Sequence, residues 1–370
     1  MTSTRPRFRL TDLPLPFVGA PMAGGPSTPA LAAAVTTAGG LGFLAAGNRS
    51  AEGVRADVAA VRGLTAGAFG VNLFVPQAAN TAAPGSAVDP AVHRSVEAYR
   101  EALRGTARRY GVELPDTDPA DDDGWAAKLE LVEELRVPVV SFTFGLPSAA
   151  VLERLGAAGS TTSVTVASVR EAEAAERAGA HLLTVQGPAA GGHRGTHRVE
   201  DVPGAEPLTE LVAAVRAAVG VPIVAAGGIA SAADAEAALA AGADAVQLGT
   251  LLLRTDEAGT SAAYREALGS GRYAGTAVTR AFSGRPARGV RNDFLDRFTD
   301  SAPAAYPQVN QLTRPIRAAA AAAGDPEAIA LWAGPQFAAA RAVPAAEVVR
   351  EVLPGRRGGR PGSRREPSGG

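Results

Sequence analysis

Residues 222–250 read "PIVAAGGIASAADAEAALAAGADAVQLGT", and this stretch decides the fold. Two short apolar runs, "PIVAAG" and "AVQLGT", flank a segment of helical period, "SAADAEAALAA". A strand, a helix and a second strand in this order are typical of a βαβ unit with parallel strands. Gly242 ends the helical segment, where glycine can adopt the left-handed conformation that turns the chain back into the sheet. The stretch therefore predicts one repeat of an α/β fold.

The same alternation extends from residue 17 to about residue 271. Apolar runs that fit eight strands are "FVGA", "LGFLAA", "AFGVNLF", "VPVVSFTF", "TTSVTV", "HLLTVQ", "PIVAAG" and "AVQLGT". Because none of these runs stands out as an edge strand, we predict a closed (β/α)₈ TIM barrel, with an open doubly wound sheet as the alternative.

Additional segments interrupt and follow the predicted barrel. An acidic loop, "DTDPADDDG", lies between helical patterns near residues 91–110 and 125–135, and the loop "RAFSGRPARGVRNDF" follows the eighth unit. The tail has no apolar residue to bury, which favours disorder. The predicted division is an N-terminal arm over 1–16, a barrel over 17–76 and 137–271, a helical insertion over 77–136, a C-terminal helical and loop addition over 272–345, and a disordered tail over 354–370.

Composition limits the partners. The 370 residues carry a formal net charge of −1, so no excess positive field attracts nucleic acid or an anionic membrane, and we expect a small-molecule partner. The absence of cysteine excludes disulfides and thiolate nucleophiles. The first residues lack an apolar run long enough for a signal peptide, so we expect a cytoplasmic protein. The single lysine, Lys128, lies in a helical segment, which argues against Schiff-base chemistry.

Glycine-rich loops follow the last two predicted strands, where barrels often hold phosphate. The backbone N–H groups of Gly227, Gly228, Gly249 and Thr250 could converge there on an anion. Tight turns without a ligand would explain either loop alone, but both loops together favour a phosphate site.

Amide side chains interrupt three apolar runs at or near the ends of strands. Asn72, Gln186 and Gln247 each stand where a core residue is expected, and a buried amide is costly unless it is paired. A flat heteroaromatic with carbonyl and imide groups would supply both donors and acceptors. Structural amides that bond to loop backbone are the alternative for each of them.

The first loop after a strand, "APMAGGPST", places Met22 and adjacent glycines where main chain could lie against a planar ring. Ser27 or Thr28 would cap the next helix, with Pro29 in its first turn. A glycine-rich turn without a cofactor is the alternative for this loop.

Two of the four histidines lie in "QGPAAGGHRGTHR", residues 186–198. His193 follows two glycines, and a neutral imidazole there could take a proton from carbon or stabilise developing negative charge. A satisfied surface histidine is the interpretation kept for His197, His93 and His181. We expect no metal site, because no carboxylate or cysteine accompanies these histidines at ligand spacing.

These motifs, taken in order, resemble those of the nitronate monooxygenase family, specifically its class I members, which are FMN-dependent (β/α)₈ enzymes formerly called 2-nitropropane dioxygenases. The resemblance covers nearly the whole chain to about residue 340. It rests on "APMAGGPSTPALAAAVTTAGGLGFLAAG", "GVNLFVP", "SFTFGLP", "QGPAAGGHRG", "AAGGI", "QLGT" and "AYPQVNQLTRPIR".

The resemblance implies noncovalent FMN at the carboxyl ends of the strands, so that 17–76 and 137–271 form an FMN-binding barrel and the addition over 272–345 covers the active site. It assigns His193 as the catalytic residue and Tyr306 to the substrate pocket, and Arg314 could steady a substrate carboxylate. The residues that would bind FMN are Pro21, Met22, Ala23, Asn72, Gln186, Gly191, Gly192, Gly227, Gly228, Gln247, Gly249 and Thr250.

The activity that the resemblance implies is oxidation of alkyl nitronates by O₂ to a carbonyl compound and nitrite, with propionate 3-nitronate favoured as substrate. One alternative is an FMN-dependent NAD(P)H:quinone or enoyl-thioester reductase, and another is a flavin-binding barrel without turnover. The oligomeric state stays open between monomer and homodimer.

The sequence departs from the family pattern at two places. Ala189 stands where relatives typically carry glutamate in the histidine motif, and Asn310 and Gln311 stand where histidines are frequent. The first departure leaves the base itself in place but could alter rate or substrate preference. The second changes the side chains expected in the outer pocket.

Overall fold

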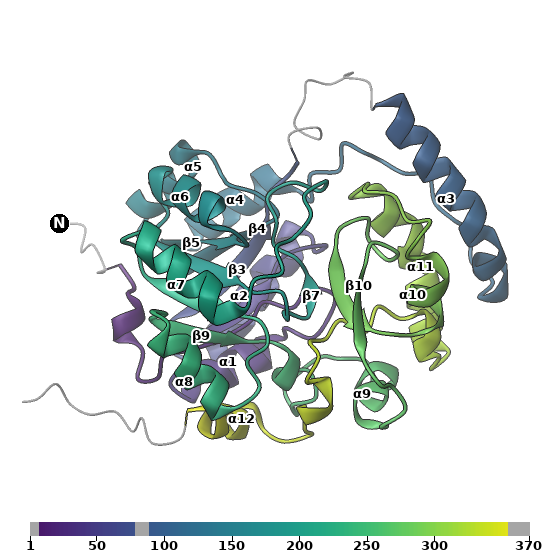
Figure 1. Cartoon of the computed structure of the whole chain (residues 1–370). Helices are drawn as coiled ribbons and strands as arrows, with labels where there is room; N and C mark the ends of the chain where they lie inside the picture. The colour runs from purple at the N-terminus through teal and green to yellow at the C-terminus, as the bar shows by residue number, and fades with distance from the viewer. Residues whose placement is uncertain (1–6, 78–88, 354–370) are drawn as a thin grey trace, which may run out of the picture.

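The computed structural model describes residues 7–77 and 89–353 (Figure 1). A parallel sheet has the strand order β1-β9-β8-β6-β5-β4-β3-β2. The N–H of Leu41, just before β2, donates to Phe17 O in β1 at 2.8 Å, which brings the two ends of the sheet together into a (β/α)₈ barrel and confirms the predicted fold. The barrel strands are β1 (Phe17–Gly19), β2 (Gly42–Ala45), β3 (Phe69–Phe74), β4 (Val139–Thr143), β5 (Thr161–Val166), β6 (Leu182–Gln186), β8 (Ile223–Ala226) and β9 (Ala245–Leu248).

Helices cover the outside of the barrel, and several begin at a serine or threonine cap. The Thr28 side chain accepts from the Leu31 N–H, so Thr28 and not Ser27 caps the first of them, and Pro29 opens its first turn. The helices of this layer are α1 (Pro29–Thr37), α2 (Ala51–Leu64), α4 (Trp125–Glu134), α5 (Ala149–Ala157), α6 (Val169–Arg177), α7 (Leu208–Ala218), α8 (Ala232–Ala240) and α12 (Ala345–Val352).

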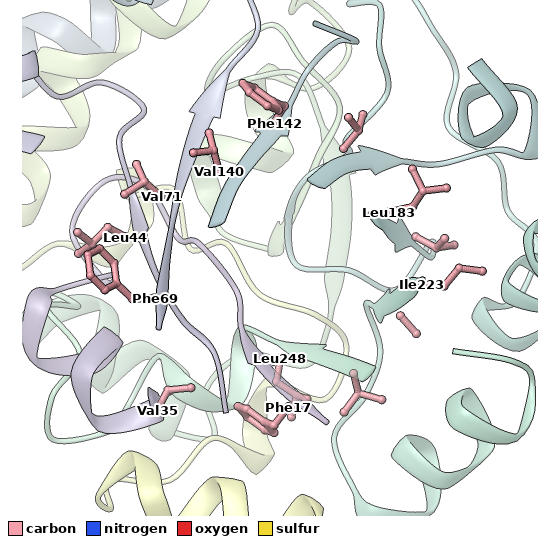
Figure 2. Close-up of a cluster of buried hydrophobic side chains, with 14 of the residues drawn as sticks. Phe17, Val35, Leu44, Phe69, Val71, Val140, Phe142, Leu183, Ile223 and Leu248 are labelled. Atoms are coloured by element: carbon pink, nitrogen blue, oxygen red, sulfur yellow. The ribbon is translucent and has the colours of Figure 1, made fainter. Parts of the chain in front are cut away.

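Alternation along the strands divides the apolar side chains between two cores. Val71 and Val140 belong to the large cluster that packs strands against helices, together with Val35 of α1 (Figure 2). Neighbouring positions such as Val139 and Leu182 belong to a smaller cluster, against which N-terminal residues including Phe8 pack. This second cluster fills the amino-terminal end of the barrel.

The two helices between β3 and β4 pack in different places. Helix α4 packs on α2 and β3, as part of the barrel wall. Helix α3 (Pro90–Arg109) lies instead along α11 (Gln308–Ala322), on the outer side of the C-terminal segment in Figure 1. The Tyr99 hydroxyl in α3 donates to the Ala281 carbonyl at 2.6 Å, which joins α3 to that segment.

The segment after the barrel forms a third apolar core with α3. It contains α9 (Ala262–Gly269), β10 (Thr276–Thr279), β11 (Ala287–Val290), α10 (Asp293–Phe298) and α11. The prediction of a loop over 280–294 was wrong in part, because β11 pairs there with β10 and with β7 (Gly192–His193). The run "ARGV" contains arginine and glycine and lacks the alternation typical of a strand. It is a strand because it pairs with β10 and β7.

Several expectations concern residues that the structure does not describe. The predicted disordered tail, residues 354–370, lies outside the described residues, as do residues 1–6 of the predicted arm and 78–88 of the predicted insertion. Within the described ranges, every helix is too short or too polar to cross a membrane.

Candidate active site

A cavity of about 570 Å³ lies at the carboxyl-terminal ends of the barrel strands and extends under the C-terminal segment. The structure brings all fifteen predicted site residues into its lining. They are Pro21, Met22, Ala23, Asn72, Gln186, Gly191, Gly192, His193, Gly227, Gly228, Gln247, Gly249, Thr250, Tyr306 and Arg314.

The charge of this lining has one sign. Aspartate and glutamate are absent from the residues that line the cavity within the described chain, whereas Arg314 and Arg317 are both present. Because a partly enclosed cavity screens charge less than bulk water does, these cations favour an anionic ligand.

The two glycine loops after β8 and β9 form one wall of the cavity. Gly227 and Gly228 have φ values of +101° and +82°, a backbone conformation that side chains disfavour. A Cβ on Gly227 would also lie 2.8 Å from the Cβ of Ala190. The N–H groups of Gly228 and Thr250 find no acceptor among residues 7–77 and 89–353, which leaves them available to an anion in the cavity.

The three predicted amides have different surroundings. Gln186 donates to the His193 carbonyl at 3.0 Å and accepts from the Gly195 N–H at 2.7 Å, so its amide fastens the histidine loop as the structural alternative predicted. Asn72 donates to Ser141 Oγ and Thr143 Oγ1 at 2.9 and 3.0 Å. The side chain of Gln247 bonds to none of the described residues, so its whole amide is available to a ligand.

Met22 is held in the first loop by its neighbour. The Met22 N–H donates to Ser27 Oγ at 2.8 Å, which explains why Ser27 does not cap α1. Gly24 and Gly25 have positive φ values, so this turn depends on glycine for its shape.

His193 enters the cavity from the short strand β7. Gly192, with φ of +78°, precedes it, and a Cβ on Gly191 would lie 2.5 Å from the Ala333 carbonyl carbon, so glycines let this loop pass close to the C-terminal segment. The imidazole Nε2 lies 2.8 Å from Ser283 Oγ. Burial, with the nearby positive charges of Arg285 and Arg317, lowers the pKa of His193 to about 3. The ring is therefore neutral near pH 7.

The other three histidines lie outside the cavity lining. His93 is exposed. His181 is half-buried, and its Nδ1 lies 2.7 Å from Thr162 Oγ1. His197 is half-buried too, and its Nε2 lies 3.1 Å from the Thr165 carbonyl oxygen. Both half-buried rings therefore have a hydrogen-bond partner, as expected of satisfied histidines, but they lie deeper than the surface position that the sequence suggested.

Arg285 is a residue beside the site that sequence reasoning missed. Its side chain is fully buried, and its guanidinium carbon lies 4.3 Å from the centre of the Phe144 ring and 5.7 Å from that of Tyr306. It donates to the Thr196 and Phe144 carbonyls at 3.0 and 3.2 Å. Burial lowers its pKa to about 10, so it keeps its charge at neutral pH. No sequence signal distinguished it from the other arginines of a predicted loop.

Ser283 was missed for the same reason, since it lies in that loop beside Arg285. Its Oγ accepts from the Arg285 N–H at 3.3 Å while it contacts His193. The pairing of β7 with β11 at His193 and Ala287 brings the two chain segments together.

Lys128 lies in α4 and outside the lining of the cavity. Its ammonium is buried, donates to the Ala46 carbonyl at 2.9 Å and forms an ion pair with Asp123 at 2.8 Å. A paired lysine away from the cavity has a structural role.

Ala189 faces the glycine loop after β8, which contains Gly227 and Gly228. A Cβ built on Gly228 would lie 2.9 Å from the Ala189 Cβ. The loop is held from its other side by Arg288, which donates to the Pro188 carbonyl at 3.1 and 3.2 Å. The loop that carries Ala189 therefore keeps a defined path.

Fold and site together define a (β/α)₈-barrel enzyme with a cationic ligand cavity at the carboxyl ends of its strands. Residues 8–355 match the model of the nitronate monooxygenase family. The chain is 40% identical to the nitronate monooxygenase of Pseudomonas aeruginosa over 95% of this chain and 98% of the relative. It is 33% identical to a probable nitronate monooxygenase of Staphylococcus aureus strain Newman, over 93% and 95% of the two chains.

Solved structures agree with this similarity. The structure of a nitroalkane oxidase from Streptomyces ansochromogenes has 49% sequence identity and a TM-score of 0.86, covering 93% of this chain and 96% of the other. FabK from Thermotoga maritima is more distant, with 28% identity and a TM-score of 0.70 over 94% and 95% of the two chains. The chain therefore belongs to the nitronate monooxygenase family, whose members are flavoproteins, and it is an oxidoreductase of nitronates.

Proposed function

We propose that this protein uses noncovalently bound FMN to oxidise alkyl nitronates with O₂, giving a carbonyl compound and nitrite. The observation that carries the proposal is a neutral His193 in a cavity lined by arginines and, among the described residues, by no carboxylate. A nitronate is an anion, and a cationic lining without carboxylates stabilises its negative charge directly.

The residues present fit FMN. The free N–H groups of Gly228 and Thr250 suit a phosphate, and the unbonded amide of Gln247 suits the polar edge of a flavin ring. Gly191 and Gly192 keep the facing loop free of side chains. When bound, FMN supplies reversible electron acceptance from the substrate, with O₂ as the final acceptor.

The side chains of the site orient and stabilise the substrate. His193, which Ser283 contacts at Nε2, would contribute a neutral imidazole beside the bound nitronate. A neutral ring can donate a hydrogen bond to an anion, whereas a pKa near 3 makes it a weak base in the free enzyme. We therefore expect nitronates to be oxidised in preference to neutral nitroalkanes. Tyr306 and Arg314 would line the substrate end, and we propose propionate 3-nitronate as a substrate.

The test is oxygen consumption by FMN-saturated protein on addition of propionate 3-nitronate, with nitrite assayed in the same vessel. Uptake coupled to nitrite supports the proposal. Rapid bleaching of the flavin by NADH without oxygen, and no response to the nitronate, would instead support the reductase alternative. A stable flavin complex inert to both reagents would support a binding protein.

A further inference from the structure

Helix α11 presents two arginines to the cavity, three residues apart. Arg314 is exposed, whereas Arg317 is half-buried. Within the described chain, the acceptors that hold Arg317 are neutral: Thr313 Oγ1 at 3.2 Å, and the Asn310 carbonyl and side-chain oxygens at 3.1 and 2.7 Å. Burial and the neighbouring Arg314 lower the pKa of Arg317 to about 10, so it is still a cation at neutral pH. Its charge is uncompensated by any of these contacts.

Two asparagines fix the direction of this guanidinium. Asn310 accepts from Arg317 through Oδ1 and donates through Nδ2 to Asn48 Oδ1 at 3.1 Å. The Asn48 N–H in turn donates to Asp123 Oδ1 at 2.9 Å. Asp123 is the acid of this array, and it already pairs with Lys128 at 2.8 Å. The array therefore leaves the positive charge of Arg317 for something inside the cavity.

The other terminal nitrogen of Arg317, Nη1, is also available to donate a hydrogen bond to a ligand. Only Nε and Nη2 donate to described residues, so Nη1 has no acceptor in this part of the chain. A half-buried cation with a free donor forms stronger hydrogen bonds to an anion than an exposed one, because water and salt screen it less. This difference favours Arg317 over Arg314, which the sequence had suggested.

We propose that Arg317 binds a carboxylate carried on the same molecule as the nitronate, and that Asn310 and Asn48 are the positioning residues that aim it. The inference deepens the proposed function and rests on it. The phosphate of FMN is a less suitable partner, because the N–H groups of the glycine wall follow β8 and β9, whereas Arg317 bonds to Asn310, which in turn bonds to Asn48 in the loop after β2.

The test compares two nitronates of matched shape on FMN-loaded protein. Propionate 3-nitronate carries the carboxylate, and 3-methylbutyl-1-nitronate carries an isopropyl group in its place. In Arg317→Gln, we expect KM for the carboxylate substrate to rise about 10- to 100-fold, the loss of a charge-assisted hydrogen bond. KM for the isopropyl substrate should change less than about 3-fold, and kcat should hold for both.

A second variant tests the charge without removing Arg317. N310D places a carboxylate at the atom that now lies 2.7 Å from the guanidinium, and it should cause the same selective rise in KM. Arg297→Gln is the control, because Arg297 is an exposed arginine on α10 that pairs with Asp293 outside the cavity. The melting temperature and FMN content of each variant show that it folds.

A binding measurement separates this inference from the proposed function. Succinate mimics the two anionic ends of propionate 3-nitronate, and Trp332 in the cavity lining reports its binding by fluorescence. Succinate binding that weakens in Arg317→Gln supports the inference even if the wild type does not oxidise nitronates. Equal losses for both nitronates, a lower FMN affinity, or unchanged succinate binding would overturn it.

Discussion

The two ends of this barrel are built from the same strands but hold different side chains. At the amino end, Val18, Phe43 and Val139 are buried in an apolar layer that N-terminal residues close. At the carboxyl end, Asn72 and Thr143 face a cavity. We infer that residues for stability and residues for chemistry are separated along the barrel axis. Substitutions at the amino end should therefore leave FMN binding and catalysis intact, and substitutions at the carboxyl end should leave folding stability intact.

The largest effect should come from His193→Asn at the carboxyl end. Loss of the imidazole removes the group beside the reacting atoms, and we expect oxidation to fall by about 10²–10⁴-fold, a range typical of lost acid–base or hydrogen-bond catalysis. The melting temperature should stay close to that of the wild type. Full activity on both nitronates and nitroalkanes would disprove the assignment of His193.

Phe43→Ala should show the opposite pattern at the amino end. Phe43 is 6% exposed, and truncating a buried phenylalanine costs about 3–5 kcal/mol in the free energy of unfolding. Urea unfolding measures this loss. The folded fraction should keep its FMN affinity and its kcat at low temperature, and a variant with normal stability but impaired FMN binding would break the comparison.

Acid should weaken the carboxyl end through His193. Its pKa is about 3 in the folded protein and about 6.5 when unfolded, so the unfolded state binds more protons between these values. The free energy of unfolding should therefore fall as pH falls through this window, by up to about 1.4 kcal/mol per pH unit from this residue. Unfolding curves at pH 6.5 and 5 should show a smaller decline for His193→Gln, and equal declines would contradict the low pKa.

The smallest effects should separate two amides of the carboxyl end. Gln247→Leu removes an amide that bonds to none of the described residues, and it should weaken FMN binding by about 3- to 10-fold. Gln186→Leu instead frees the histidine loop, so we expect a lower kcat with nearly normal FMN affinity. Flavin titration and steady-state kinetics on both variants make the comparison, and identical profiles would show that the two amides share one role.

The sequence predicts most of the barrel because each βα unit carries the same local sequence pattern. Apolar runs, serine or threonine caps and Ala-Gly helix ends fall within a residue or two of the observed bounds, as for β8 and α8. The strand-end glycines and His193 could be predicted as site residues because the carboxyl ends of all the strands of a barrel lie at one face.

The remaining part of the site comes from contacts between distant segments. Strand β11 exists through its pairing with β10 and β7, and this pairing brings Ser283 to His193 and buries Arg285. Arg314 and Arg317 cannot be told apart in the sequence, because they lie three residues apart in one helical segment and so fall on the same side of the helix. Their different burial depends on how α11 packs, which no local pattern encodes.

The most direct test of the central claim is the ratio of initial oxygen-uptake rates on propionate 3-nitronate and on its parent nitroalkane, with nitrite measured alongside. The cationic cavity and a neutral, weakly basic His193 predict that the nitronate reacts at least about 10²-fold faster and releases nitrite. Equal rates would show that His193 works as an effective base, and would contradict the account.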